Sequence, residues 1–309
     1  MNFCFTGQQQ LAADAISQML ERQPRVTVHS ERFLLGSELD VTLEDSGFHQ
    51  IGADPDLGNV SAVDFVIQVA RQPVAIEIAA TVLVRPRLCP DAPRPLALVR
   101  GTNPVRFGAD ARTALIDAGS TVLRLDVQPG DFVPLNSTFA YPLAKLSNEA
   151  RKRAVPLEAD DAPGLLRQYW EIGLAAETTG AIESALRSTV DHVTQRKQFG
   201  QPIGAFQAVQ HRLAEAAVLL EAARWLTLKA GDSGDPIDAA LAAGYAQDAA
   251  RRVTYDFHQF HGAMGLTFEH PLHLWTYRLK SLFGELGGSA ARFESSALGV
   301  WGYPSVKGV

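Results

Sequence analysis

The stretch RKQFGQPIGAFQAVQH, residues 196–211, lies between two helical patterns of the sequence. Gly200 and Pro202 end the first pattern, because glycine is a poor helix former and proline lacks the amide hydrogen that a helix interior needs. Beyond them, apolar side chains recur along one stripe at helical spacing, at Phe206, Val209, Leu213, Ala216, Leu220 and Ala223. The stretch therefore predicts a tight turn between two long helices.

Helical patterns on both sides of this turn extend over residues 151–309. One amphipathic pattern precedes the turn, and another follows the break GDSGDP at residues 231–236. Long helices that are joined by short breaks pack antiparallel in a bundle. We predict a C-terminal four-helix bundle over residues 151–309.

The preceding part of the chain contains short β-prone runs. These runs lie at residues 96–99, 121–125 and 132–135 and are separated by clusters of Gly, Pro, Asn and Asp. They predict an abbreviated β domain over residues 88–150, with about five or six strands of average length.

Residues 1–87 carry helical patterns in shorter pieces. The first begins at Thr6, which has the capping-box spacing to Gln9. We therefore predict an N-terminal helical domain over residues 1–87. The fold class that follows is mostly α with a small β segment, in the order helical domain, β domain, helical bundle.

Composition indicates an ordinary globular protein without nucleic-acid or membrane partners. The 28 Lys and Arg against 34 Asp and Glu leave a net charge of −6, which argues against a general nucleic-acid-binding surface. The longest apolar stretch, residues 73–84, is interrupted by Glu77 and is shorter than a membrane span. The N-terminal residues lack signal-peptide features, and Cys4 and Cys89 lack disulfide or zinc-site spacing. We expect a cytoplasmic protein.

A second block, QFHGAMG at residues 259–265, completes a motif pair with residues 196–211. The first block resembles the R-x-x-F-G-x-x-[IL]-x-x-[FH]-Q stretch of the flavin-dependent acyl-CoA dehydrogenase family, and the second resembles the family's Q-x-x-G-G-x-G element. The helical, β, helical order of the chain is also similar to that family. The resemblance implies FAD as cofactor and α,β-desaturation of a CoA thioester as activity.

In the family, these two blocks contact the FAD of a neighbouring subunit, so the resemblance implies half of a shared site. Its predicted members are Arg196, Gln198, Phe199, Gln259, Gly262, Ala263 and Gly265. A guanidinium beside a helix-breaking turn can hold a pyrophosphate through two charge-assisted hydrogen bonds. Glycines allow a close backbone approach, and Ala263 departs from the family, which usually has glycine there.

The predicted β domain lacks two family elements that line the flavin ring and the thioester. Residues 90–147 contain neither the acidic-Gly-Ser-Asp stretch nor the Lys-x-Trp-[IV] strand, and they contain no tryptophan. We therefore expect that this chain does not enclose the isoalloxazine ring by itself.

The chemistry also needs a carboxylate that removes the α-proton of the thioester. Glu285 lies one position early relative to the family glutamate and lacks its flanking Tyr and Thr. Glu171 lies near a second family position, on the first helix of the bundle. Both are candidate bases with incomplete matches, whereas Glu177 is interpreted as a packing or salt-bridge residue.

These features resemble the shorter chain of heteromeric bacterial acyl-CoA dehydrogenases that act on steroid-CoA substrates. The resemblance implies a heterotetramer with a full-length, flavin-binding partner, a bulky acyl-CoA substrate and an electron-transfer flavoprotein or similar acceptor. Two alternatives remain open: a complete homotetrameric dehydrogenase that uses Glu285 as base, and a structural subunit that contacts no cofactor.

Four histidines raise the further possibility of a metallohydrolase. His258 and His261 form one HxxH pair, and His270 and His273 form another. Such pairs can bind a metal, but neither cysteine nor regularly spaced acidic residues complete a recognisable ligand set. We predict that these histidines are packed or face solvent and that the protein has no metal site.

Overall fold

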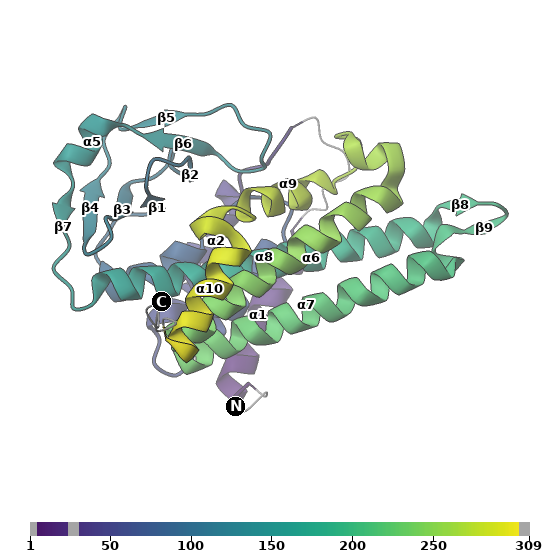
Figure 1. The fold of residues 1–309 in the computed structure, drawn as a ribbon, viewed down its shortest axis with the longest axis horizontal. Coiled ribbons are helices and arrows are strands. Elements are labelled where there is room, and N and C mark those ends of the chain that lie inside the picture. Colours follow the sequence, from purple (N-terminus) through teal and green to yellow (C-terminus); the bar gives the residue numbers. More distant parts are fainter. Residues whose placement is uncertain (1–4, 24–30, 303–309) are drawn as a thin grey trace, which may run out of the picture.

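The computed structural model describes residues 5–23 and 31–302 of the chain. Its long helices lie side by side, and a group of small β-sheets lies next to one end of them (Figure 1). Cys4 falls outside the described residues, and Cys89 is a buried free thiol. The mostly helical class predicted from the sequence is confirmed.

Short helices form the N-terminal part: α1 (Gly7–Glu21), α2 (Ser37–Asp45), η1 (Phe48–Ala53), α3 (Gly58–Ala70), η2 (Ala80–Val84) and α4 (Arg85–Leu88). The predicted capping box of α1 is present, because the Thr6 hydroxyl accepts from the Gln9 amide and the Gln9 side chain accepts from the Thr6 amide. Helix α3 is buried over most of its length and packs against the bundle. It is therefore the central helix of this part.

Glu77 joins the N-terminal part to the β-sheets. Its buried carboxylate accepts hydrogen bonds from the Thr81 amide at 3.1 Å, the Thr81 hydroxyl at 2.7 Å and the Leu96 amide at 3.0 Å. A buried carboxylate is tolerated where several donors satisfy it. The charge that interrupts the apolar stretch 73–84 is thus part of the connection between helix and sheet.

The β part consists of two small sheets packed over a shared apolar core. The first has the order β1-β3-β4-β7, in which β1 (Leu96–Arg100) and β3 (Thr113–Asp117) are parallel and the other pairs are antiparallel. The second has the order β2-β6-β5. The remaining strands are β2 (Val105–Arg106), β4 (Val122–Asp126), β5 (Phe132–Pro134), β6 (Leu143–Leu146) and β7 (Val155–Pro156).

The three predicted β-prone runs all coincide with strands, namely β1, β4 and β5. Strand β3 was not predicted, because all five of its residues are buried and the run has no polar alternation to distinguish it. Strand β7 pairs with β4 from beyond residue 150, the predicted end of the β part. The short helix α5 (Asn148–Arg153) lies between β6 and β7.

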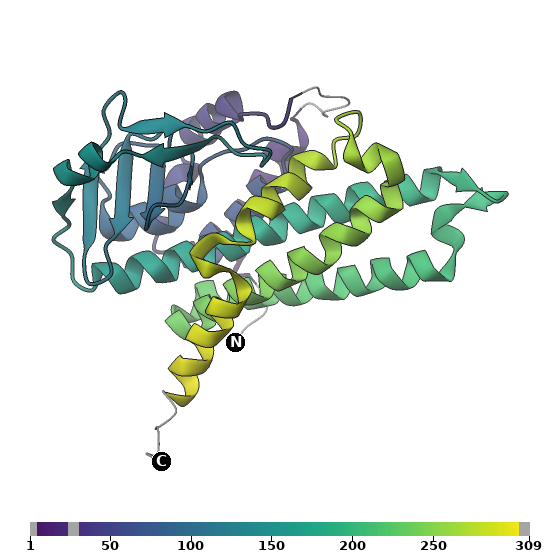
Figure 2. The ribbon, with the colours of Figure 1, turned by 45° about the horizontal axis from the view of Figure 1, so that its top comes forward.

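The C-terminal part contains the long helices α6 (Ala162–Gln195), α7 (Gln207–Ser233) and α8 (Pro236–His261), followed by α9 (His273–Leu282) and α10 (Gly288–Trp301). The predicted turn near Gly200 is a hairpin of β8 (Lys197–Gln198) and β9 (Gln201–Pro202), followed by the short turn η3 (Ile203–Ala205). Helix α9 packs on α6, and α10 packs along α8 and extends away from the sheets (Figure 2). In the described part of the chain, no helix combines the length and apolar character needed to cross a bilayer.

The main apolar core is continuous from the N-terminal helices into the bundle and to strand β1. Helices α3 and α6 approach each other closely beside this core, where Gly180 faces the backbone of α3. A Cβ atom at position 180 would lie 2.2 Å from the Ile67 carbonyl oxygen and 2.8 Å from the Ala70 Cβ. The absence of a side chain at Gly180 thus sets the distance between these helices.

We expect Gly180→Ala to lower the free energy of unfolding by about 1–3 kcal/mol, because the added methyl group forces α3 and α6 apart. Gly7→Ala is the control, since a Cβ at that exposed helix position meets nothing within 4 Å. Urea unfolding followed by circular dichroism measures both changes. Equal midpoints for the two variants would show that α3 and α6 can separate without cost.

Candidate functional site

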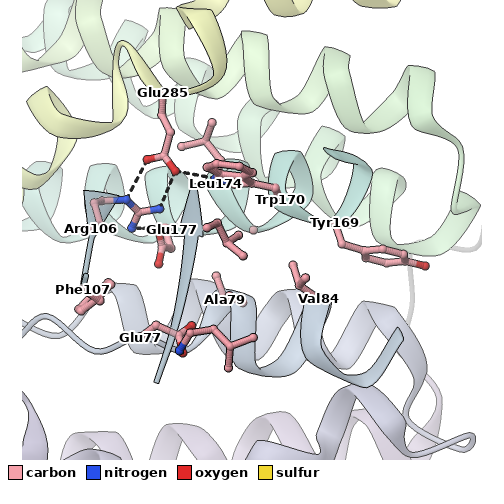
Figure 3. A pocket seen from close by; sticks show the side chains of 14 residues that line it. Glu77, Ala79, Val84, Arg106, Phe107, Tyr169, Trp170, Leu174, Glu177 and Glu285 are labelled. Carbon is pink, nitrogen blue, oxygen red and sulfur yellow. Dashed lines mark hydrogen bonds and ion pairs between the residues drawn. The ribbon is translucent and has the colours of Figure 1, made fainter. Parts of the chain in front are cut away.

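A buried ion cluster lies where the β-sheets meet the bundle (Figure 3). Arg106 comes from β2, Glu177 from the middle of α6 and Glu285 from the short turn η5 (Glu285–Gly287). The Arg106 guanidinium donates to Glu177 at 2.6 Å and to the two oxygens of Glu285 at 2.8 and 3.1 Å. The indole N–H of Trp170 also donates to Glu285, at 2.6 Å. One cation therefore joins three segments that are far apart in the sequence.

The cluster is shielded from water and carries two negative charges against one positive charge. The side chains of Arg106, Glu177 and Glu285 are 14%, 7% and 16% exposed. Burial raises the pKa of Glu177, and the net effect stays upward although Arg106 opposes it. Burial acts to lower the pKa of Arg106, but the two carboxylates hold it well above its usual value. Arg106 therefore stays charged, and a proton taken up by the cluster goes to a carboxylate.

Glu285, the first candidate base, has its carboxylate turned toward Arg106 and Trp170. Its oxygens accept hydrogen bonds from both side chains, so the carboxylate must break these bonds before it can contact a substrate carbon. The cavity beside the cluster has a volume of about 40 Å³, which is room for a few water molecules. It does not accommodate a three-ring flavin beside a thioester.

A larger cavity, of about 530 Å³, lies next to this cluster between the sheets and α10. Glu285 and three guanidinium groups, those of Arg100, Arg106 and Arg292, contribute to its lining. Each of these guanidinium groups is already paired with a carboxylate, Arg100 with Asp117, Arg106 with Glu177 and Glu285, and Arg292 with Glu171.

Glu171, the second candidate base, is held in a buried ion pair with Arg292 of α10. Burial raises the pKa of Glu171, and the attraction of Arg292 opposes this effect. Glu171 lines neither the 40 Å³ nor the 530 Å³ cavity. In this structure it joins α6 to α10. The interpretation of Glu177 as a salt-bridge residue is confirmed by its contact with Arg106.

The first predicted cofactor block lies at the far end of the bundle, on the β8–β9 hairpin. Arg196 ends α6, and its exposed side chain has no ion pair with a carboxylate of the described residues. Gln198 is exposed on β8. Phe199 is 92% exposed. Phe199 and Gly200 form the two-residue turn of the hairpin, and both have a positive φ, 53° and 83°, so both adopt the left-handed conformation. The hairpin thus presents a cation and an aromatic ring away from the core.

The second predicted block lies at the end of α8 and in the turn η4 (Gly262–Leu266). Gln259 and Gly262 line a largely apolar pocket of about 500 Å³, together with Tyr255 and Phe283. Ala263 is exposed nearby. Gly265 is buried, and its carbonyl oxygen lies 2.8 Å from the His258 ring.

The structure brings the two blocks to the same end of the bundle. His192, one turn before Arg196, stacks on His261, the residue before Gly262, with ring centroids 4.3 Å apart. Arg196, Gln198 and Phe199 nevertheless do not line the pocket of Gln259. The two candidate bases lie elsewhere, Glu285 beside Arg106 and Glu171 beside Arg292.

Arg106 is the residue of this site that the sequence did not reveal. It stands in the run LVRGTNPVRFG without a motif, and nothing local distinguishes it from Arg100. Its role depends on two carboxylates that lie on other elements, so only the tertiary contact identifies it.

The fold and the motif pair define an acyl-CoA dehydrogenase architecture, and the model of the acyl-CoA dehydrogenase C-terminal domain matches residues 171–290. Residues 171–290 are therefore similar to the C-terminal domain of that family. The chain is 36% identical over 154 residues to the acyl-CoA dehydrogenase IpdE2 of Mycobacterium tuberculosis, a match that covers 50% of this chain and 45% of the relative.

Solved structures show the same fold over nearly the whole chain. A chain of the ChsE4-ChsE5 complex from Mycobacterium tuberculosis matches with a TM-score of 0.76 and 21% identity, over 99% of this chain and 100% of that chain. A chain of the Tcur3481-Tcur3483 steroid ACAD matches with a TM-score of 0.71 and 20% identity, over 94% of this chain and 96% of that chain. The sequence match spans less than half of the length of the curated relative IpdE2.

The raised pKa of Glu177 predicts that the free energy of unfolding falls as pH rises. The Glu177 carboxyl group binds its proton more tightly in the folded state than in the unfolded state. Its contribution to stability is therefore complete below the unfolded-state pKa of 4.5 and is lost as the pH rises above the folded-state pKa. Glu177→Gln removes this titration. From pH 4.5 to pH 8, the unsubstituted protein should therefore lose stability relative to the Glu177→Gln variant.

Urea unfolding at the two pH values measures this difference. Glu294→Gln, which alters an exposed carboxylate on α10, is the control and should follow the unsubstituted protein at both values. An equal pH dependence for Glu177→Gln and the control would contradict the raised pKa.

Proposed function

We propose that this chain is the shorter subunit of a heteromeric acyl-CoA dehydrogenase and that a full-length partner supplies the flavin-ring pocket and the catalytic base. The main observation is the state of Glu285. Its carboxylate accepts hydrogen bonds from Arg106 and Trp170 beside a cavity of about 40 Å³. The predicted cofactor residues of the two blocks, Arg196, Gln259 and Gly262 among them, lie at the other end of the bundle, and we call them the cofactor strip. A carboxylate that is already held by two donors, together with an exposed cofactor strip, supports a site shared with a second chain.

The residues of the strip fit the diphosphate and adenosine side of FAD. Arg196 offers a guanidinium that no carboxylate of the described residues neutralises, and a planar guanidinium matches a pyrophosphate through paired hydrogen bonds. Gln259 and Gly262 line an apolar pocket of about 500 Å³, in which an amide can bond a nucleoside and a glycine permits close approach. The flavin ring itself does not fit the 40 Å³ cavity of this chain.

When bound, FAD supplies the acceptor for the hydride that leaves the β-carbon of the thioester. The contribution of this chain is to bind and orient. Arg196 would neutralise phosphate charge, Gln259 would hydrogen-bond the nucleoside, and Phe199 would contact the cofactor. Removal of the α-proton falls to a carboxylate of the partner.

A bulky acyl-CoA, such as a steroid-CoA ester, is the substrate class that we propose for the assembly. The similarity to a chain of the Tcur3481-Tcur3483 steroid ACAD supports this class, and the similarity to a chain of the ChsE4-ChsE5 complex supports a heteromeric assembly. An electron-transfer flavoprotein or a similar acceptor reoxidises the flavin.

The stoichiometry of FAD tests the assembly. We expect the chain expressed alone to bind no flavin, and the chain co-expressed with its partner to form a tetramer with about one FAD per two polypeptides. Native mass and flavin absorbance measure both quantities. A yellow homotetramer with about one FAD per chain would overturn the proposal.

Arg196→Ala tests the cofactor contact directly. Losing two charge-assisted hydrogen bonds should weaken FAD binding by the assembled complex at least about tenfold, measured by flavin fluorescence on dilution. Arg187→Ala is the matched control, because Arg187 is an exposed arginine of the same helix and forms an ion pair with Glu183. Unchanged binding in Arg196→Ala would instead favour a structural subunit without cofactor contacts.

A complete homotetrameric dehydrogenase is the second candidate function. It is favoured by one observation, namely that Glu285 also lines the 530 Å³ cavity. In that case Glu285→Gln should abolish turnover of the chain purified alone while FAD remains bound. No turnover of the unsubstituted chain alone excludes this alternative.

A further inference from the structure

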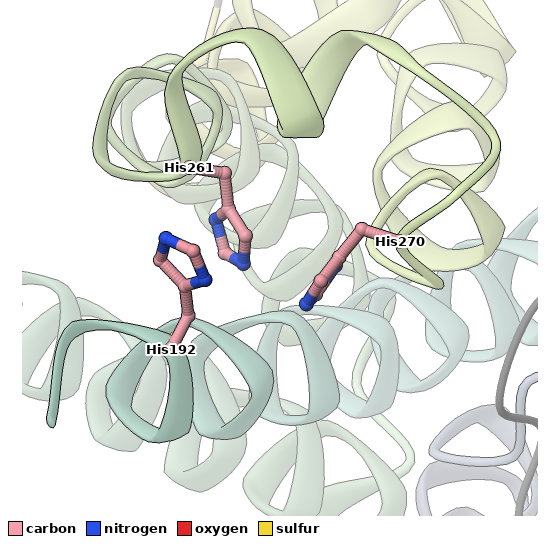
Figure 4. Close-up of side chains that lie close together, drawn as sticks. All are labelled: His192, His261 and His270. Carbon is pink, nitrogen blue, oxygen red and sulfur yellow. The ribbon is translucent and has the colours of Figure 1, made fainter. Parts of the chain in front are cut away.

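Three imidazoles from separate segments meet at the end of the bundle (Figure 4). His192 lies in the last turn of α6, His261 is the last residue of α8, and His270 lies between η4 and α9. Each contributes one ring nitrogen to a group in which all three nitrogens lie within 4.8 Å of one another. We propose that His192, His261 and His270 form a three-histidine site for a divalent transition-metal ion, with Zn²⁺ as the expected occupant. This inference does not rest on the proposed function.

His261 is prepared for this role by its backbone contact. Its Nδ1 lies 2.8 Å from the Phe257 carbonyl oxygen, which places the proton on Nδ1 and the lone pair on Nε2. The side chain is 4% exposed, and its buried Nε2 has no hydrogen-bond partner in the described part of the chain. A buried acceptor that faces two other imidazoles without a partner is satisfied by a cation.

The surrounding backbone also favours a positive charge. Helices α6 and α8 both end at this cluster, and the carbonyl end of a helix carries a partial negative charge. A cation bound by the cluster would therefore lie beside two helix carbonyl ends.

His270 is the ligand that must adjust most. Its Nδ1 accepts a hydrogen bond of 3.2 Å from the Leu272 amide, which places its proton on Nε2. Coordination through Nε2 moves this proton to Nδ1 and ends the bond from Leu272. A tetrahedral zinc site with Zn–N distances of 2.0–2.1 Å separates its nitrogens by about 3.4 Å, so the three rings must also close by about 1 Å.

The site differs from the histidine set considered from the sequence. His258 contacts the Gly265 carbonyl oxygen at 2.8 Å and the Thr276 hydroxyl at 3.0 Å. His273 contacts the carbonyl oxygens of His270 and Glu31, at 2.8 and 3.1 Å. Both nitrogens of each ring are therefore occupied. The prediction of no metal site considered His258, His261, His270 and His273. It did not consider His192, whose position next to His261 only the fold reveals.

The donor set identifies the metal class. Three imidazole nitrogens without a thiolate or carboxylate suit Zn²⁺, Co²⁺, Ni²⁺ or Cu²⁺ rather than Mg²⁺ or Ca²⁺, which prefer oxygen ligands. Three protein ligands also leave a fourth position for water or a ligand atom, the pattern of zinc sites that are not purely structural.

Metal titration of the untagged full chain, stripped with a chelator, tests the proposal. We expect one Zn²⁺ per chain by competition with a chromophoric chelator, and visible absorption typical of four-coordinate cobalt when Co²⁺ is added. His192→Gln and His270→Gln should each weaken Zn²⁺ binding at least about tenfold, because a three-ligand site loses a third of its donors. These two are chosen because His261 is buried and its substitution could prevent folding.

His211→Gln is the control, since His211 is an exposed histidine on α7 outside the cluster. It should bind Zn²⁺ like the unsubstituted chain. Zinc should also raise the melting temperature of the unsubstituted chain and of His211→Gln, but not that of the double variant His192→Gln/His270→Gln. Equal affinity in the double variant, or the absence of a cobalt spectrum, would overturn the proposal and leave a packed histidine cluster.

Discussion

The buried guanidinium of Arg106 is the interaction on which the arrangement of the chain depends. It connects β2 to the middle of α6 and to the turn that precedes α10, and the Trp170 indole adds a second link between α6 and that turn. Two carboxylates around one cation in a site poor in water leave a net negative charge, so the cluster is sensitive to the loss of either kind of partner. Removal of one member of a buried ion pair typically costs more than the pair contributes, because the remaining charge is left uncompensated. The position of the sheets against the bundle is thus coupled to that of Glu285.

This constraint separates two parts of the molecule that are united in a complete dehydrogenase site. Near the sheets, Arg106 and Trp170 hold the Glu285 carboxylate, which also lines the cavity of about 530 Å³. At the opposite end of α6, the hairpin that follows Arg196 extends beyond the core and exposes Phe199. The same helix therefore lies beside a held carboxylate at one end and carries an exposed hairpin at the other. A subunit that completes a partner's cofactor site needs the second feature and can dispense with the first.

The open end also holds the three-histidine cluster. Because α6 and α8 both end there, a metal ion bound by His192, His261 and His270 would tie together the two segments that carry Arg196 and Gly262. Binding of a metal at this cluster would therefore fix the relative position of the two blocks of the proposed cofactor strip. Its nitrogens are provided by two helix ends and one loop, so its formation depends on correct packing of the whole bundle end.

The sequence by itself determined those features whose physical cause is local. Helical spacing of apolar residues located the long helices, the Thr6 capping box located the start of α1, and Gly200 with Pro202 located the hairpin turn. The motif pair indicated the family. The tertiary structure alone decided the pairing of Arg106 with Glu285, the place of β3 inside its sheet and the meeting of His192 with His261. These contacts join residues that are distant along the chain, and no local pattern encodes them, because their energy arises only when packing removes water and brings the partners together.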